Sequence, residues 1–426
     1  MLEYVALGVF AVVYALIIGR RRFGVPIWAA MLAGAALMVG LQVTGIEGAF
    51  AAVKLEVIAF LFGMFSLVSA LERAGVLERL AAGMIARVRT PSQILMIFVV
   101  GMGVLAAFLV NDTIALLGIP LAVQVARHAG IKPTVLLMAL AFGITVGSVM
   151  TPIGNPQNLL IAIDSGMDLP LLNFLLYLGA PTAANLFITY LILKRYFRKE
   201  LAEALAVREV GQGNGVEHDN DSRQARLAIY VTLATLAGFV ISELLHSLGI
   251  AELGLSVVAM LGAATLYALS SDRTQILKSV DYSVLVFFAA MFVVTSAMWS
   301  SGAISVITGW LPQPDPSDRV QSIGVISAAS LSLSQVLSNV PFVALYDYVM
   351  IDSGFTGHHV SQWLMLAAAS TIAGNLTILG AASNIIIIEA AEARGIRAFG
   401  FFEFAKIGAI ITAANIAVYA AFFMLV

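Results

Sequence analysis

The fold is decided by residues 151–161, which read TPIGNPQNLLI from Thr151 to Ile161. Residues 377–387 read TILGAASNIII, and both stretches follow the pattern Thr-x-x-Gly-x-x-x-Asn ahead of three aliphatic residues. Asn111 lies 40 residues before the first stretch and Asn339 lies 38 residues before the second. Agreement in pattern, order and spacing indicates that the chain consists of two related halves.

Each stretch interrupts a long apolar run at a point where a helix is difficult to continue. Pro152 and Pro156 remove backbone donors and clash with the preceding turn, and Gly154 and Gly380 lower the cost of non-helical backbone. A lone break in a membrane helix is more often a packing kink. Two matched breaks instead predict a binding site, because half-helix N-termini present unpaired N–H groups to anions and the opposing oxygens can coordinate Na⁺.

The composition is that of a membrane protein. Of the 426 residues, 60% are hydrophobic and 11% are charged, which a soluble fold of this size could not keep in solution. The chain has no cysteine, so disulfides and thiolate metal sites are excluded. Residues 2–19 differ from a signal peptide because Arg20, Arg21 and Arg22 follow the apolar run instead of preceding it. We expect this segment to be retained as the first membrane helix.

Apolar runs long enough to cross about 30 Å of hydrocarbon predict ten membrane spans. They cover residues 2–19, 26–43, 56–71, 133–163, 170–193, 227–247, 250–270, 281–309, 361–388 and 402–426. Two further apolar segments, 92–126 and 320–350, carry polar residues at their centres, and we interpret both as re-entrant hairpins. With the amino terminus outside, every Lys and Arg except Lys54 and Arg319 then lies on the cytoplasmic side, as the positive-inside rule requires. Both termini are therefore predicted to lie outside a bacterial-type inner (plasma) membrane.

The predicted fold class is an all-α polytopic membrane protein built from two inverted repeats. The first half is residues 1–194, with the hairpin 92–126 and a discontinuous helix at 133–163. The second half is residues 227–426, with the hairpin 320–350 and a discontinuous helix at 361–388. The polar segment 195–226 between them is interpreted as a cytoplasmic linker. Because each half crosses five times, the second half is inserted upside down relative to the first.

Charged residues are placed unevenly with respect to this topology. Asp112 is the carboxylate predicted to lie deepest in the membrane, where a charge is costly and marks a functional site by default. Capping of backbone amides at the hairpin tip is the alternative role. Glu243, Asp347 and Asp352 fall near the outer ends of spans, where we expect interfacial solvation. No span or hairpin has Lys or Arg at its middle, so the site suits a small anion, a neutral oxyacid, or a cation drawn to Asp112.

The sequence lacks the patterns of several other protein classes. It has no Walker A loop, no His-Glu-x-x-His motif and no histidine spacing typical of a metal site. We therefore expect neither an enzyme nor an ATP-driven pump, no cofactor beyond Na⁺ or H⁺ as a coupling ion, and no nucleic acid partner.

The hairpin tips and the two breaks resemble motifs of the ion transporter superfamily, and of its YbiR-type, arsenite-permease and NhaD-like branch above all. The residues that carry the resemblance are Asn111-Asp112-Thr113, Thr151 to Asn158, Leu333 to Pro341, and Gly374 to Asn384. Citrate carriers and divalent anion/sodium symporters belong to the same superfamily. The resemblance implies a homodimer in a lipid bilayer, with the first three spans of each half as a scaffold. The hairpins, discontinuous helices and final spans would form a transport domain that moves as an elevator.

The resemblance also implies the positions of the binding residues. They are Asn111, Asp112, Thr113, Thr151, Gly154, Asn155, Pro156, Asn158, Ser338, Asn339, Pro341, Asn375, Thr377, Gly380, Ser383 and Asn384. Na⁺ is expected near Asn111, Asn155, Asn339 and Asn384, and Asp112 is expected to couple transport to a proton or sodium gradient. Dicarboxylate symporters tend to carry Ser-Asn-Thr at both tips, and this chain does not. A dicarboxylate is therefore the less suitable substrate.

We thus expect a secondary active transporter of arsenite-permease type that moves a small inorganic oxyacid or anion. Three alternatives stay open at this point. The chain could be a sodium/proton antiporter, a small-carboxylate carrier, or a passive channel that uses the hairpins as a fixed selectivity filter.

Overall fold

The computed structural model describes residues 2–85, 88, 90–204, 222–251, 253–308 and 312–425. In these residues the regular secondary structure is helical, which confirms the all-α fold class. The middle of the predicted linker, residues 205–221, lies outside the described residues. Its two ends are helical, because Arg198–Glu203 forms α14 and α15 begins at Ser222.

The helices follow the predicted apolar runs closely. Up to the linker they are α1 (Leu2–Ile18), α2 (Arg20–Phe23), α3 (Ile27–Gly40), α4 (Ile46–Ala52), α5 (Leu55–Arg73), α6 (Val76–Ile85), α7 (Pro91–Met96), the π-helix η1 (Ile97–Gly101), α8 (Met102–Leu109), α9 (Asn111–Ala129), α10 (Pro133–Gly147), the 3₁₀ turn η2 (Ser148–Met150), α11 (Pro156–Asp164), α12 (Pro170–Asn173), the π-helix η3 (Phe174–Leu178) and α13 (Gly179–Tyr196). After the linker they are α15 (Ser222–Ser247), α16 (Leu255–Leu269), α17 (Arg273–Ser279), α18 (Tyr282–Ser300), α19 (Ala303–Thr308), α20 (Arg319–Leu337), α21 (Asn339–Asp352), α22 (Val360–Ala373), the 3₁₀ turn η4 (Ile378–Gly380), α23 (Ala382–Glu392) and α24 (Phe401–Leu425).

Eight continuous helical runs in the described residues are long and apolar enough to cross a membrane. Two of them, Pro91–Leu109 and Arg319–Leu337, are the first arms of the predicted hairpins. The other six, together with the four shorter apolar helices α1, α3, α16 and α22, coincide with the ten predicted spans. The chain is therefore a multi-pass integral membrane protein.

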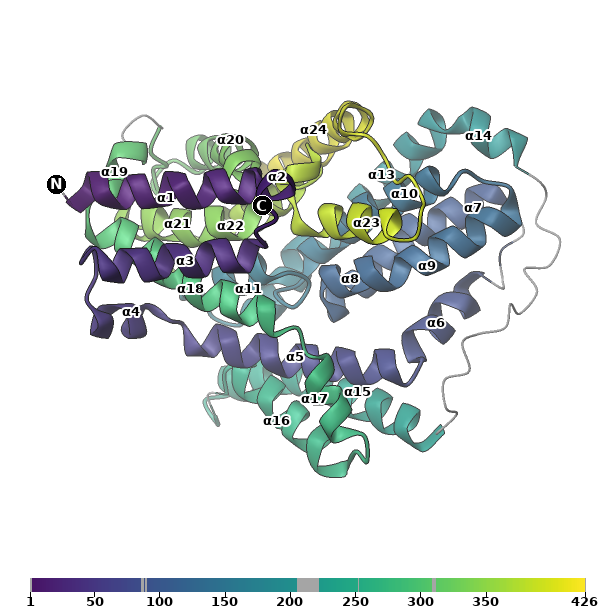
Figure 1. Ribbon diagram of the computed structural model, residues 1–426, viewed down its shortest axis with the longest axis horizontal. Coiled ribbons are helices and arrows are strands. Elements are labelled where there is room, and N and C mark those ends of the chain that lie inside the picture. The colour runs from purple at the N-terminus through teal and green to yellow at the C-terminus, as the bar shows by residue number, and fades with distance from the viewer. Residues whose placement is uncertain are drawn as a thin grey trace.

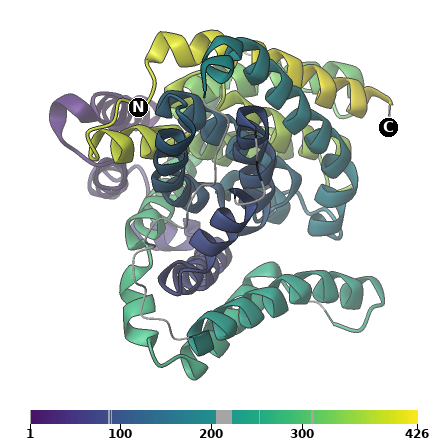
Figure 2. The same cartoon turned by 90° about the vertical axis from the view of Figure 1, so that its right-hand side faces the viewer.

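The third span of each predicted half packs against the first two spans of the other half. Helix α5 packs against α15 and α16, and α18 packs in the same way against α1 and α3. Figure 1 shows these two groups, with α1, α3 and α18 on one side and α5, α15 and α16 along the lower edge. In Figure 2 the α15–α16 pair lies along the lower edge of the molecule, where α16 packs against α5. The pairing is the same in both groups, as expected for two related halves; their inverted orientation stays a prediction.

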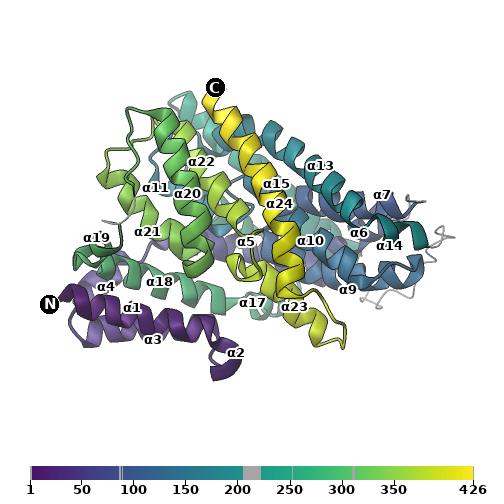
Figure 3. The same ribbon diagram turned by 90° about the horizontal axis from the view of Figure 1, so that it is seen from above.

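The remaining long helices form a second body with the same reciprocal packing. Helix α10 packs against α8 and α9, and α22 packs against α20 and α21. The second arms then cross over, because α9 packs against α23 while α21 packs against α11. The final long helices α13 and α24 pack together, as Figure 3 shows from above. Both hairpins therefore contact the discontinuous helices.

Small residues let the first hairpin approach its discontinuous helix at backbone distance. A Cβ atom added at Gly147 would lie 2.0 Å from the carbonyl oxygen of Gly103, and one at Gly143 would lie 2.6 Å from that of Val99. Contacts of this kind are typical of close helix pairs in membranes. The glycines therefore set the position of the hairpin beside the break.

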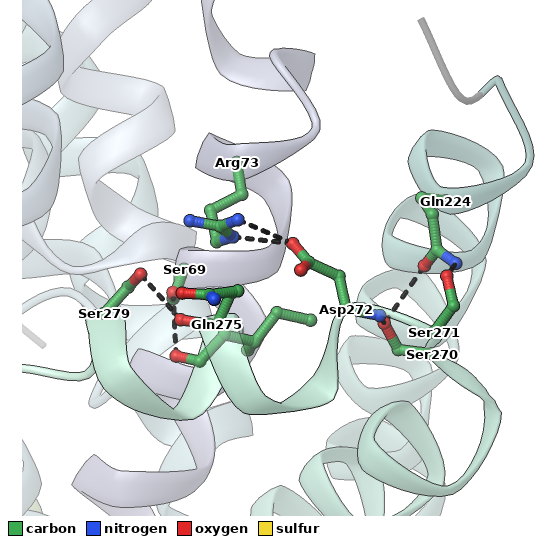
Figure 4. A network of polar contacts seen from close by, with 9 residues as sticks. Ser69, Arg73, Gln224, Ser270, Ser271, Asp272, Gln275 and Ser279 are labelled. Atoms are coloured by element: carbon green, nitrogen blue, oxygen red, sulfur yellow. Dashed lines mark hydrogen bonds and ion pairs between the residues drawn. The ribbon is translucent and has the colours of Figure 1, made fainter. Parts of the chain in front are cut away.

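A polar network joins the C-terminal end of α5 to α15, α17 and the loop before α17 (Figure 4). The Arg73 guanidinium donates to Oδ2 of Asp272 at 2.8 Å, and Ser69 Oγ donates to the carbonyl oxygen of Ile276 at 3.2 Å. Gln224, at the start of α15, accepts a bond from Ser270 at 3.0 Å. The network ties the loop after α16 to the end of α5.

Candidate functional site

Both hairpins turn on a single strained residue. Val110 separates α8 from α9 with φ 65°, and Ser338 separates α20 from α21 with φ 66°. Positive φ is rare for a residue with a side chain and is an outlier for a β-branched one. Strain of this kind persists where the surroundings hold it, and it concentrates at functional sites. The two tips thus share a backbone conformation that the sequence pattern did not reveal.

The first tip is bonded directly to the first break. The Asn111 N–H donates to the carbonyl oxygen of Gly154 at 2.9 Å. The Thr151 hydroxyl donates to the carbonyl oxygen of Ala107 on the other arm and accepts the N–H of Gly154 at 3.0 Å. Residues Thr151 and Gly154 of the repeated pattern therefore act together to hold the tip against the break.

Two asparagines close the first break. Helix α10 continues into the turn η2, which ends at Met150. Helix α11 then begins at Pro156, because the fixed φ of proline suits the first position of a helix. Asn155 precedes Pro156, and its side-chain oxygen caps α11 by accepting the N–H of Asn158 at 2.9 Å. The Asn158 amide reaches back to the carbonyl oxygens of the break at 3.0–3.2 Å. The carbonyl oxygens of Ser148, Val149 and Thr151 are therefore satisfied within the protein.

Thr371, on α22 of the second half, links this network to the rest of the site. Its hydroxyl donates to Oδ1 of Asn158 at 3.2 Å and accepts from Nδ2 of Asn155 and Nε2 of Gln157, both at 3.3 Å. Sequence reasoning missed Thr371 and Gln157 as site residues. A signal existed, because Thr371 precedes the repeated Thr377 by the same six residues that separate Thr145 from Thr151.

The second break has a different set of bonds. Thr377 donates to the side-chain oxygen of Gln335 at 2.7 Å, and Gln335 donates to the carbonyl oxygen of Ala373 at 2.8 Å. Nδ2 of Asn384 donates to the carbonyl oxygen of Gly374 at 2.8 Å. Gln335 comes from α20, so the first arm of the second hairpin is bonded to the second break. The sequence string had pointed to this segment, although Gln335 was not among the predicted ligands.

The second tip lies against the same break. A Cβ atom added at Gly374 would lie 3.0 Å from Nδ2 of Asn339, and one at Gly380 would lie 3.2 Å from Oε1 of Gln335. Ala381 occupies the N-cap position of α23, as Asn155 does for α11. The methyl side chain of alanine cannot accept a hydrogen bond from the first backbone N–H groups of the helix. The start of α23 therefore has no side-chain cap.

Several buried polar atoms of the site have no hydrogen-bond partner among the described residues. They are Oδ1 of Asn111, Oδ1 of Asn339, both side-chain polar atoms of Asn375, Oγ of Ser383 and Oδ1 of Asn384. A buried polar group normally has a partner, and one left without is a candidate for a ligand, an ion or a water. All but Asn111 belong to the second half. The buried polar side chains of the first break are thus satisfied within the protein, whereas those of the second break offer oxygen ligands.

Asp112 lies in the first turn of α9, where the helix N-terminus favours a negative charge. Its side chain and that of Thr113 are half-buried, and Asp112 accepts no hydrogen bond from the described residues. Asp281, just before α18, is close enough to act on it electrostatically. Pro341 is buried in the first turn of α21. Of the predicted residues, Asp112, Thr113, Ser338 and Thr377 are thus half-buried, while the asparagines are buried.

Comparison with known proteins places this site in a family context. Residues 14–373 match the model of a family described as citrate transporter. The uncharacterized transporter Rv2685 of Mycobacterium tuberculosis is 29% identical over all of this chain and 99% of its own length. The silicon efflux transporter LSI3 of rice, Oryza sativa, is 29% identical over 91% of this chain and 88% of its own. The YdaH transporter of Alcanivorax borkumensis has a related fold, with a TM-score of 0.57 at 16% identity over 91% of this chain and 88% of that one.

Proposed function

The chain belongs to the citrate transporter family, and we propose that it is a secondary active transporter for a small inorganic oxyacid or anion. Membership in this family makes it a membrane transporter of the ion transporter superfamily. The proposal adds a cargo, a coupling ion and a mode of movement to that statement.

The observation that carries the proposal is the set of unpaired side-chain groups at the second break. Asn339, Asn375, Ser383 and Asn384 offer oxygen and amide groups without charge, and they lie where the second tip meets the break. The uncapped start of α23 adds free backbone N–H groups at the same place. Neutral donors and acceptors suit a small solute that carries hydroxyl groups, because each hydroxyl both donates and accepts.

The name of one relative agrees with this chemistry. The rice relative is named for silicon efflux, and its similarity extends over most of both chains. A small oxyacid of this kind carries hydroxyl groups and little charge, so it needs no Lys or Arg at the site. We therefore place neutral oxyacids, with arsenite and silicic acid as probes, ahead of multiply charged anions.

We propose Asp112 as the group that couples transport to a proton or sodium gradient. It stands next to Asn111, whose side-chain oxygen is unpaired, and it begins the helix that packs against α23. A proton or Na⁺ at this carboxylate would change the charge beside the solute site. The scaffold helices pack mainly against one another and the helices of the hairpin body do the same, which supports an elevator movement in which the second body slides along the first.

The oligomeric state and the orientation are further parts of the proposal. Helices α15 and α16 expose apolar side chains such as Leu233, Ile241 and Leu261, which are 54–59% accessible. Lipid or a second copy of the chain would cover them, and we propose a homodimer with both termini outside the membrane.

A small-carboxylate carrier is the second candidate, because the matching family model is described as a citrate transporter. The absence of Lys and Arg from the middle of every predicted span speaks against a citrate-sized trianion. A sodium/proton antiporter would move ions without any added solute, and a passive channel would show no saturable counterflow.

Flux through proteoliposomes distinguishes these functions. The purified chain is reconstituted, and uptake of arsenite, silicic acid, citrate and Na⁺ is measured under imposed pH or sodium gradients. Solute uptake that follows a gradient, saturates and shows counterflow supports the proposal. Asp112→Asn should abolish the dependence on the gradient, and the exposed Glu392→Gln serves as the matched control. Gradient-driven uptake that persists in Asp112→Asn would refute the coupling role.

A further inference from the structure

A lysine and an aspartate from different parts of the fold form an ion pair away from the hairpin tips. The Lys54 ammonium, between α4 and α5, donates to Oδ2 of Asp164, the last residue of α11. Their side chains are 28% and 11% accessible. Lys54 belongs to the scaffold side and Asp164 to the hairpin body. The pair therefore bridges the two bodies of the molecule.

A second carboxylate, that of Asp347, lies near this pair. Asp347, in the middle of α21, is 2% exposed, and neither of its carboxylate oxygens has a hydrogen-bond partner among the described residues. Asp164 and Lys54 both act on it electrostatically. The expectation of interfacial solvation is thus wrong for Asp347, because α11, α18, α20 and α22 pack around α21 and exclude solvent.

Among the described residues, the four helices that pack around α21 bring little further charge to Asp347. Helices α18 and α22 contain no charged residue, α20 contains Arg319 at its first position, and α11 contributes Asp164. The Lys54 ammonium also lies 5.7 Å from the ring centre of Phe292 and 5.9 Å from that of Tyr348. It is thus held by the aromatic rings as well as by Asp164. One ammonium faces two carboxylates in a largely buried site.

We propose that Asp347 holds one exchangeable proton beside the Lys54–Asp164 ion pair, and that it is a protonation site separate from Asp112. A buried carboxylate without hydrogen-bond donors, near a second carboxylate that is already paired with Lys54, ionises only at a large penalty, and one retained proton removes that penalty. With Asp347 protonated, its O–H can donate to Asp164, and the charges of Lys54 and Asp164 cancel. On release, the O–H bond of Asp347 breaks, the electron pair stays on its carboxylate, and the proton passes to water. The net charge of the cluster then changes from zero to minus one.

Proton exchange at this place would bear on movement between the bodies. Lys54 precedes α5, whereas Asp164 and Asp347 belong to α11 and α21 of the hairpin body. The net charge of this cluster therefore affects the contact between the two bodies, which would move past each other in an elevator mechanism. This consequence rests on the proposed function. The protonation itself does not, because it can be measured without a transported solute.

Infrared difference spectroscopy tests the site directly. The full-length protein in lipid is perfused between acidic and alkaline buffer, and the C=O stretch of protonated carboxylic acids is recorded. We expect a band that disappears in Asp347→Asn and is kept in Asp352→Asn, which removes the exposed carboxylate at the end of the same helix. Asp112→Asn should also keep this band.

A second variant guards against misfolding of Asp347→Asn. In Lys54→Met the band should persist to more alkaline buffer by about one pH unit or more, because the ammonium no longer stabilises the deprotonated carboxylate of Asp347. A spectrum without any band sensitive to Asp347, or a band that responds to Na⁺ and not to pH, would overturn the proposal. Since no solute is present, failure of the flux assay leaves this result unaffected.

Discussion

Replacing Thr371 by valine removes one hydroxyl from the bond network of the first break while it keeps the shape of the side chain. The hydroxyl bonds Asn158 at 3.2 Å and Asn155 and Gln157 at 3.3 Å. Asn155 keeps its bonds to Ser148, but Oδ1 of Asn158 and Nε2 of Gln157 lose the partner that the structure gives them. Each orphaned buried group costs about 1–3 kcal/mol. The two bonds are long, at 3.2 and 3.3 Å, so we take the lower part of this range for each group. The variant should therefore lose about 2–3 kcal/mol of unfolding free energy in total.

This loss can be measured as a shift of thermal unfolding in detergent at a fixed scan rate. An unfolding entropy of about 2.1 cal/mol/K per residue, over 426 residues, converts the loss into a fall in Tm of about 2–3 °C. The matched control is Ser370→Ala, since the neighbouring buried hydroxyl bonds the carbonyl oxygen of Ala367 within its own helix. Equal Tm values for Thr371→Val and Ser370→Ala would refute the linking role of Thr371.

Three further substitutions probe other parts of the fold. Gly154→Ala would place a Cβ atom 2.3 Å from the carbonyl oxygen of Ser148 across the break, and this clash should cost about 1–3 kcal/mol of stability or more. In the control Gly8→Ala nothing lies within 4 Å of the added Cβ atom, so stability should change by less than about 1 kcal/mol. Similar melting temperatures for the two variants would argue against the close approach at Gly154. Glu243→Gln should cost about 1–3 kcal/mol, because the buried carboxylate accepts two backbone N–H groups at the start of α12 at 2.6 and 2.9 Å; a chemical denaturation curve unchanged from that of the parent protein would refute this. Arg73→Ala should lower the free energy of unfolding by less than about 1 kcal/mol, since the side chains of Arg73 and Asp272 are both exposed. A larger loss in chemical denaturation would mean that the network of Figure 4 contributes more to stability than we infer.

The sequence was sufficient to predict the long apolar helices and the breaks, because both depend on local composition, whereas the short helices α4, α6 and α17 lie outside the predicted spans. The discontinuous helix predicted at 133–163 corresponds to α10, η2 and α11, which together end at Asp164. Apolar length sets where a span can lie, and proline and glycine set where its backbone must be interrupted. The break at Thr151 and the helix start at Pro156 follow from these rules.

Contacts between distant segments were beyond sequence reasoning. Lys54 and Asp164 are 110 residues apart, and Lys54 had stood out merely as an exception to the positive-inside rule. Glu243 and Asp347 were expected at the solvated interface, yet both are buried. Their burial depends on which helices pack around α15 and α21, and one-dimensional hydropathy does not contain that information. The positive φ angles at Val110 and Ser338, which the two hairpin tips share, likewise depend on packing.

The unpaired groups at the second break are the centre of the account, and Ser383→Ala tests them most directly. The Ser383 hydroxyl is buried and has no hydrogen-bond partner in the described part of the chain, so its removal should leave stability unchanged or slightly higher. If the hydroxyl binds the transported solute or its coupling ion, the apparent Km for counterflow in proteoliposomes should rise about tenfold, the loss of roughly 1.4 kcal/mol of binding. Ser327→Ala, whose hydroxyl bonds Ile323 within α20, should leave Km unchanged. An unaltered Km for solute and ion in Ser383→Ala would contradict the assignment of this break as the binding site.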